Sequence, residues 1–335
     1  MNMNRGYGDK SAVISLIRLI AMLLIITCHI FQIYSNELCY YFNVGVQIFL
    51  IISGYLYSFK TYDSPLNIII KQFKKILFPY YILLNCILLA YIIFIPSSIS
   101  IESVSNAVFC SGTLEGQGHL WFIPYILFCY LITPYLYWLR CRLENKHDKV
   151  FVSVCILLIL FLIISKSYHS YFRADIISCY ILGYFFKDFS RRYLTDKGRH
   201  KMTIITVIVT IVLIFIRIYI DYIGNIQLNG FTDSLYYYFK SYSHVLLGFS
   251  IFLSLFTFAS KVQYCKILHL SDKYSYLIYL VHGTFILSPL NVMFVTSNLF
   301  INILIALICT IISAVILYEM TEYLSSKIGL NARKH

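Results

Sequence analysis

The sequence predicts an all-α polytopic membrane protein with about ten transmembrane helices and both termini in the cytoplasm. Hydrophobic residues make up 59% of the chain and charged residues only 13%, whereas soluble globular proteins carry about 25% charged residues. The mean hydropathy of +0.75 is equally high. Apolar segments long enough to cross about 30 Å of hydrocarbon recur along the whole chain. These observations exclude an ordinary soluble domain.

Ten apolar segments meet or approach the length that a membrane span requires. The second and sixth are the shortest, and the sixth begins with Arg173 and Asp175. The ten expected spans are 11–34, 44–59, 76–95, 120–139, 150–165, 173–187, 202–220, 242–260, 274–293 and 299–324.

The distribution of basic residues supports this arrangement of spans. If the N-terminus is cytoplasmic, 22 of the 27 Lys and Arg residues fall on the cytoplasmic side and three fall outside. Arg18 and Arg217 lie within spans. Short cytoplasmic loops carry an excess of Lys and Arg, so this split places both termini in the cytoplasm. Without the sixth span, the basic loop 187–201 would fall outside, and the span is therefore retained.

The loops are too short for a second folded domain, because each is under about 25 residues. We therefore expect one integral-membrane domain over 1–335, without a separate soluble domain. The first apolar run is too long for a cleaved signal peptide. The net charge of +12 follows from the cytoplasmic loops, so it does not indicate nucleic-acid binding. The ten cysteines show no CxxC and no metal-ligand spacing, and no bound metal is expected.

Arg18 and His29 are two polar groups within the first span, LIRLIAMLLIITCHIF. A charge inside a membrane is costly and usually marks a functional site. Eleven helical residues separate the two side chains by roughly 16 Å along the axis and leave them within roughly 20° of one face. Taken singly, His29 could make a helix–helix hydrogen bond and Arg18 could extend to the cytoplasmic surface. Together they indicate that this face of the helix lines one channel, which reaches toward both membrane faces.

The segment GVQIFLIISGYL, residues 45–56, combines the small residues Gly45, Ser53 and Gly54 with the polar residue Gln47. Gly45, Ser53 and Gly54 allow a helix or a ligand to approach closely, and Gln47 faces the outer half of the span. Plain helix packing explains the same pattern, and the segment alone favours that explanation.

The segment KQFKKILFPYY, residues 71–81, carries Lys71, Lys74 and Lys75 on one face of a helix that enters from the cytoplasm. Such a cluster can bind phosphate groups. It is also the usual positive anchor of a membrane span, and both interpretations stay open.

Two further segments carry histidines near or within spans. In HLWF, His119 and Trp121 lie at the outer membrane interface, where an aromatic belt accounts for the tryptophan. In YSYLIYLVHGTFI, residues 274–286, His282 falls in mid-span. A neutral histidine bonded to a neighbouring helix would explain it without any function.

In their order and spacing, these five segments resemble the integral-membrane acyltransferase 3 family over essentially the whole chain. Its members transfer acyl groups, most often acetyl, from acyl-CoA to sugars of surface polysaccharides, glycolipids or antibiotics. The resemblance implies that His29 is the essential histidine and Arg18 its paired arginine. The chain departs from the family where Gln47 replaces a commoner acidic residue and Leu50 a frequent phenylalanine. Its basic cluster is lysine, which binds phosphate without the bidentate geometry of arginine.

The resemblance implies O-acylation at the cytoplasmic (inner) membrane, with acetyl-CoA as co-substrate and no permanently bound cofactor. The phosphates of acetyl-CoA would bind the lysine cluster, Lys71, Lys74 and Lys75, with Arg18 as a further candidate contact, and its thioester would lie near His29. An imidazole with the usual pKa near 6.5 suits a general base, here acting on a hydroxyl of a glycan or lipid-linked saccharide. Gln47, Ser53, Gly54, His119, Trp121 and His282 are expected to bind donor or acceptor.

Several features of this mechanism stay open. An acyl-histidine intermediate is compatible with the same residues. An acyl-serine on Ser53 is less favoured, because the sequence places no base near it. Glu115 and Asp175 are candidates for an acid that orients His29. A different class also remains: a transporter, flippase or polymerase of a surface polysaccharide, which would use Arg18 and Arg217 as substrate or relay charges. Asp221 lies four residues after Arg217, so a simple ion pair explains Arg217 equally well.

Overall fold

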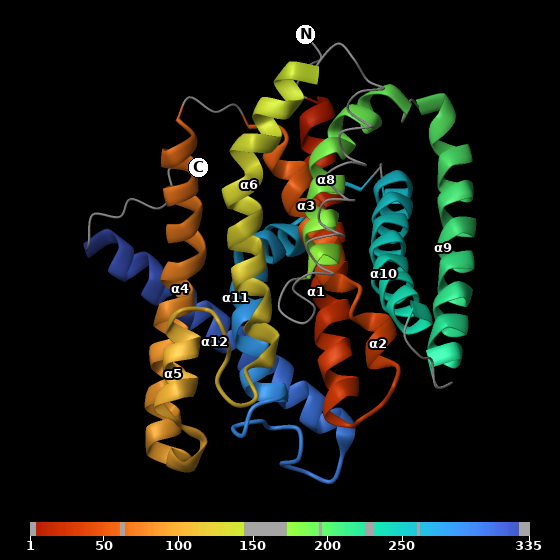
Figure 1. Ribbon diagram of the computed structural model, residues 1–335. Helices are drawn as coiled ribbons and strands as arrows, with labels where there is room; N and C mark the ends of the chain where they lie inside the picture. Colours follow the sequence, from red (N-terminus) through yellow and green to blue (C-terminus); the bar gives the residue numbers. More distant parts are fainter. Residues whose placement is uncertain are drawn as a thin grey trace. The chain divides into compact units, whose positions relative to one another are not determined.

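The computed structural model describes residues 5–60, 64–143, 173–193, 196–224, 231–259 and 262–327. Throughout these ranges the regular structure is helical, with no strand, as Figure 1 shows. This confirms the predicted all-α class. The helices are α1 (Arg5–Ile33), α2 (Cys39–Phe42), α3 (Gly45–Tyr57), α4 (Pro65–Phe94), α5 (Ile101–Val108), α6 (Phe122–Leu143), α8 (Ala174–Tyr193), α9 (Asp196–Gly224), α10 (Phe231–Phe258), α11 (Lys266–Ile286) and α12 (Leu299–Lys327), with 3₁₀ turns η1 (Pro96–Ser98) and η2 (Gly118–Trp121).

Seven stretches of the described residues are helical, long and apolar enough to cross a membrane. They agree with the predicted first, second, third, fourth, seventh, eighth and tenth spans and support a multi-pass membrane protein. The predicted fifth span, 150–165, lies outside the described residues. The full count of ten and the cytoplasmic termini stay predictions. The seven stretches are Ala12–Ile33, Cys39–Tyr57, Ile69–Phe94, Gly118–Arg142, His200–Asp221, Tyr238–Phe258 and Leu299–Lys327.

The predicted sixth and ninth spans form helices, α8 and α11, but neither is among these seven. In α8 the polar positions Asp175 and Lys187 are buried against protein. A helix that faces protein in this way can carry polar residues that lipid would not tolerate. Helix α11 ends at Ile286, before the predicted residue 293. The carbonyl of Gly283 accepts the N–H groups of Leu287 and Ser288, and the following Pro289 cannot continue a helix.

The described residues fall into two compact units, and several helices contribute to both. The expectation of a single domain is not tested by this division and stays a prediction. The first unit comprises Met1–Ile25, Asn43–Thr61 and Ile132–His269, and the second comprises Ile26–Phe42, Tyr62–Leu131 and Leu270–His335.

In the first unit, glycines bring α3 and α8 into direct backbone contact (Figure 1). A Cβ atom on Gly54 would clash with the carbonyl oxygen of Tyr180, and one on Gly183 would clash with that of Ile51. Helices in a membrane associate largely through close packing, because lipid is as apolar as their side chains. The two glycines therefore set the distance between these helices.

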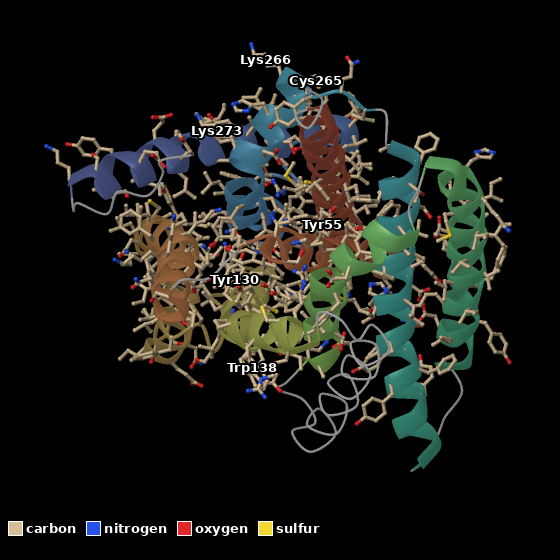
Figure 2. The ribbon with its side chains drawn as sticks, turned by 90° about the horizontal axis from the view of Figure 1, so that it is seen from above. Tyr55, Tyr130, Trp138, Cys265, Lys266 and Lys273 are labelled. Atoms are coloured by element: carbon tan, nitrogen blue, oxygen red, sulfur yellow. The ribbon has the colours of Figure 1, made fainter. Side chains whose placement is uncertain are left out.

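An aromatic cluster fills the interior of the same unit around Tyr55, which Figure 2 labels. The ring of Tyr55 is 3% exposed. Its centroid lies 5.5 Å from that of Phe186 on α8, and 6.3 Å and 5.6 Å from those of Phe252 and Phe256 on α10. Edge-on aromatic pairs at such separations contribute about 0.5–1.5 kcal/mol beyond their buried area. These contacts join α3, α8 and α10.

In the second unit, tyrosines of α4 anchor the segment that runs from α4 to η2. The hydroxyl of Tyr80 donates to the carbonyl of Ala107 at 2.6 Å, and that of Tyr91 donates to the carbonyl of Glu115 at 2.8 Å. Helix α12 packs against α4 from elsewhere in the chain. The loop that leads into His119 is thereby held in a defined position.

The predicted topology can be tested with a reporter at the C-terminus. We expect an alkaline phosphatase fused after His335 to be inactive and a green fluorescent protein fused there to fluoresce, because the 22-to-3 charge split places that end in the cytoplasm. An active phosphatase at the C-terminus would overturn the predicted orientation.

The contact between α3 and α8 predicts that Gly54→Ala destabilises the protein. The added methyl group must displace the backbone of Tyr180, and overpacking of this kind costs about 1–3 kcal/mol. Thermal unfolding in detergent measures the effect. Gly118→Ala is the matched control, because its Cβ would meet no atom within 4 Å. Equal unfolding temperatures for the two variants would contradict the packing role of Gly54.

Candidate active site

Three histidines from distant parts of the sequence meet in the second unit. His29 comes from α1, His119 from η2 and His282 from α11. The ring centroid of His29 lies 5.1 Å from that of His282 and 6.1 Å from that of His119. The rings of His119 and His282 are 4.7 Å apart. Three of the residues that the sequence singled out therefore form one cluster, which we call the histidine cluster.

The three rings differ in their exposure. His119 is 2% exposed and His282 is fully buried, whereas His29 is half-buried. The ring of Tyr279 lies 5.8 Å from that of His119 and 5.7 Å from that of His282 and closes the buried side. His29 is therefore the member of the histidine cluster that a substrate can reach most readily.

Hydrogen bonds determine which nitrogen of each ring carries the proton. Nδ1 of His29 lies 2.8 Å from Oε1 of Gln32. Nε2 of His119 lies 3.0 Å from the carbonyl oxygen of Leu280, and Nδ1 of His282 lies 2.7 Å from that of Tyr279. Amide and carbonyl oxygens only accept, so in each pair the ring N–H donates. In a neutral imidazole the other nitrogen then keeps a lone pair.

The cluster therefore presents three acceptor nitrogens: Nε2 of His29, Nδ1 of His119 and Nε2 of His282. The last two are buried without a hydrogen-bond partner. A buried polar atom left unsatisfied costs about 1–3 kcal/mol, which favours a ligand or water that donates to them. Among the described residues, no group of three or more His, Cys, Asp and Glu side chains is arranged to hold a metal ion.

Helix α11 determines where His119 lies. A Cβ atom on Gly283 would overlap the imidazole of His119, so only glycine leaves room for the ring. The hydroxyl of Tyr279 donates to the backbone carbonyl of His119. Nearby, the side-chain amide of Gln117 donates to Oγ1 of Thr284 at 3.3 Å. These contacts join η2 to α11, and the sequence gives no signal that the two segments meet.

The group that orients His29 is the amide of Gln32, three residues further along α1. The sequence analysis expected an acid, Glu115 or Asp175, in this role. The carboxylate of Asp175 pairs with Arg173 at 2.7 Å. Glu115 stays a candidate, because its described contact with Tyr91 involves only the backbone carbonyl. The separation of i and i+3 on one helix could have identified Gln32, because such residues are neighbours on the helix surface.

Arg18 lies on the same helix as His29 but belongs to the first unit, where it is half-buried. Because α1 is continuous from Arg5 to Ile33, the predicted separation of roughly 16 Å along the helix holds.

The residues of the α3 segment also belong to the first unit. Gly45 packs against the backbone of α1 at Ala21, and Gly54 packs against α8, so helix packing accounts for both glycines. Gln47 is 1% exposed and its Oε1 has no hydrogen-bond partner, while Ser53 is half-buried. Their predicted role in binding donor or acceptor stays a prediction.

The lysine cluster and Trp121 belong to the second unit. Lys71, Lys74 and Lys75 are exposed on α4, as expected for three residues on one helix face. Trp121 directly follows the η2 residues His119 and Leu120, and its ring lies edge-on to that of Tyr125, 5.7 Å away. No described contact joins the lysine cluster to the histidine cluster.

Comparison with known proteins agrees with the resemblance found in the sequence. A family model described as an acyltransferase domain matches residues 12–319, which includes every residue of the histidine cluster and of the lysine cluster. No curated protein and no solved structure matches the chain. Because the family model spans most of the sequence, the chain belongs to the acyltransferase 3 family.

Proposed function

We propose that this protein transfers an acyl group, with acetyl favoured, from cytoplasmic acyl-CoA to a hydroxyl of a cell-surface glycan or lipid-linked sugar. The observation that carries the proposal is the 2.8 Å contact between Nδ1 of His29, a half-buried ring, and Oε1 of Gln32. With that amide oxygen as the acceptor, Nδ1 carries the proton and Nε2 keeps a lone pair. Acyl transfer to a hydroxyl needs such a base to remove a proton.

In the proposed reaction, Nε2 of His29 removes the proton of the acceptor hydroxyl as its oxygen attacks the thioester carbonyl. The new C–O bond forms and the C–S bond breaks. The proton then passes from the imidazolium to the departing thiolate of CoA. The amide oxygen of Gln32 keeps the ring in the correct tautomer throughout, a role that a carboxylate fills in other histidine-dependent enzymes.

The other two histidines suit an acceptor that is rich in hydroxyl groups. Nδ1 of His119 and Nε2 of His282 are acceptors that lack partners, and a sugar offers several O–H donors at close spacing. This chemistry favours a saccharide over an acceptor without donor groups.

For the donor, we propose that the lysine cluster binds the phosphates of CoA; a contact of the donor with Arg18 stays a prediction from the sequence. The three lysines are exposed on one face of α4, where charge-assisted contacts to phosphate can form. Membrane lipids are the surrounding partner, and the cytoplasmic membrane is the proposed location.

A transporter or flippase is the less favoured alternative. It would use Arg217 as a substrate charge, but Nε of Arg217 pairs with Asp221 at 3.2 Å, as the simple ion-pair explanation expected. The histidine cluster, in contrast, has unsatisfied acceptors and a base that the alternative does not require.

We predict that His29→Ala reduces acylation of the acceptor by about 10²–10⁴-fold, the usual effect of losing a general base. Transfer of radiolabelled acetyl from acetyl-CoA to a cell-envelope glycan measures the effect. Leu23→Ala is the control, because Leu23 lies on the same helix with its side chain exposed. Near-normal transfer by His29→Ala at normal abundance would show that His29 is structural.

We also predict that the double variant Lys71→Gln, Lys74→Gln raises the KM for acetyl-CoA and leaves the KM for the acceptor unchanged. The expected rise is roughly fivefold, because two exposed charge contacts of about 0.5 kcal/mol each together contribute about 1 kcal/mol. Lys266→Gln is the control, since this exposed lysine lies outside the cluster. Orientation in the membrane must be checked, because lost positive charge weakens the inside signal. With correct orientation, an unchanged KM would reduce the lysine cluster to a membrane anchor.

A further inference from the structure

Buried polar side chains follow one face of α11, in the second unit. Ser271 is 6% exposed, Ser275 is 4% exposed and His282 is fully buried. They stand at positions i, i+4 and i+11 of one continuous helix, so they lie within about 40° of one face and extend over roughly 16 Å of the axis. We call these three residues the polar stripe. The proposed function uses only His282, so the rest of the polar stripe needs a further explanation.

Helix α4 runs in the same direction as α11, and hydrogen bonds connect the two helices at two levels. At the first level, the hydroxyl of Tyr276 donates to the carbonyl of Ile76 at 2.8 Å. Further along both helices, the side-chain amide of Gln117 donates to the hydroxyl of Tyr91 at 3.4 Å and to Oγ1 of Thr284 at 3.3 Å. The residues that precede the first level therefore lie at the same end of α4 and α11.

Gln72 of α4 lies at that shared end, as does Ser271 of α11. Each precedes the contact between Ile76 and Tyr276 by roughly one turn of its helix. The side chain of Gln72 is 4% exposed. Gln72 also directly follows Lys71 in the chain, so it adjoins the lysine cluster. The polar stripe therefore starts at the end of the unit that carries the lysine cluster, and it ends in the histidine cluster.

Three polar atoms of these side chains are buried and have no hydrogen-bond partner. They are Oε1 of Gln72, Oγ of Ser271 and Nε2 of His282. A buried polar atom that stays unpaired destabilises a protein, and native structures pair the large majority of such atoms. Because the three atoms are spread over the length of the polar stripe, they favour a long ligand that offers hydrogen bonds at intervals over a single ion at one position.

The pantetheine arm of acyl-CoA has the chemistry that these atoms require. It is a narrow chain with two amide groups, each with an N–H that donates and a carbonyl that accepts a hydrogen bond. Fully extended, the arm is about as long as four peptide residues, or roughly 14 Å, which is close to the length of the polar stripe. Its phosphate end would lie toward the lysine cluster and its thioester end toward the histidine cluster.

We propose that Gln72 and Ser271 bind the pantetheine arm of acyl-CoA. Oε1 of Gln72 accepts a hydrogen bond from one amide N–H of the arm, and the hydroxyl of Ser271 donates to the carbonyl of the other amide. The arm then lies extended along the polar stripe. This inference rests on the proposed function, which supplies acyl-CoA as the donor, and it adds two residues that the sequence analysis did not single out.

The test is the binding of two ligands to the purified full-length protein in detergent, measured by isothermal titration calorimetry. Coenzyme A carries the phosphates and the arm but no acyl group, so no transfer can occur. Adenosine 3′,5′-bisphosphate carries nucleotide phosphates without the arm. We expect Ser271→Ala and Gln72→Met each to weaken the binding of coenzyme A about fivefold, the usual effect of losing one neutral hydrogen bond. The binding of the bisphosphate should not change.

Thr310→Val is the matched control. Oγ1 of Thr310 is likewise buried without a hydrogen-bond partner, but it belongs to α12 rather than to α4 or α11. Thr310→Val and Ser271→Ala should each unfold at the wild-type temperature or above, because each removes an unpaired polar atom. Only Ser271→Ala should weaken the binding of coenzyme A. A serine with a purely structural role would not lose binding while the protein keeps its stability.

The proposal is overturned if Ser271→Ala and Gln72→Met bind coenzyme A as tightly as the wild-type protein does, a result that buried water at both atoms would explain. It is also overturned if the variants weaken the binding of coenzyme A and of the bisphosphate equally. Either result leaves the proposed function standing, because the wild-type protein still binds the donor. If the wild-type protein itself fails to bind coenzyme A, the proposed donor is wrong, and the arm site with it.

Discussion

The carbonyl oxygens along one turn of α11 govern the chemistry of the histidine cluster. Those of Tyr279 and Leu280 accept the protons of His282 and His119, so the tautomer of each buried ring is fixed by backbone rather than by another side chain. A carbonyl has two lone pairs, and a helical carbonyl can therefore serve the helix and a side chain together. Because a backbone position is harder to displace than a rotamer, the free nitrogens keep constant directions.

Backbone carbonyls also accept hydrogen bonds from side chains in the first unit, where polar groups near lipid must find partners within the protein. The carbonyl of Ser58, directly after α3, accepts from Nη1 of Arg140 at 2.5 Å and from Nζ of Lys187 at 3.0 Å. Two cations at the carboxyl end of a helix also complement its dipole. Arg140 is in turn paired with Asp188 at 2.9 Å. Two cations thus satisfy the carbonyl that follows α3, whereas Nδ1 of His119 and Nε2 of His282 have no hydrogen-bond partner.

Sequence periodicity and charge predicted the helical class and most spans, because a membrane imposes a simple rule on length and composition. Helices α8 and α11 fall short of that rule, because charged residues such as Asp175 in α8 and Lys273 in α11 lie within them. The sequence also identified His29, His119 and His282 one at a time. It could not bring them together, since their meeting depends on tertiary contacts such as the space that Gly283 leaves for His119. Gln32 was missed because an amide was not considered as a partner for a base.

Because the side chain of Gln32 is a neutral amide, it does not favour a protonated His29 as a carboxylate would. A carboxylate beside His29 would stabilise its protonated form, and two further imidazoles at 5.1 Å and 6.1 Å would then face a cation. With a neutral amide, all three rings can remain neutral, and each keeps its acceptor nitrogen. A positive charge on His29 would arise only while a proton is in transit. For the base that we propose His29 to be, the arrangement favours quick return of the proton over its storage, which suits the proposed transfer with a thiolate as leaving group.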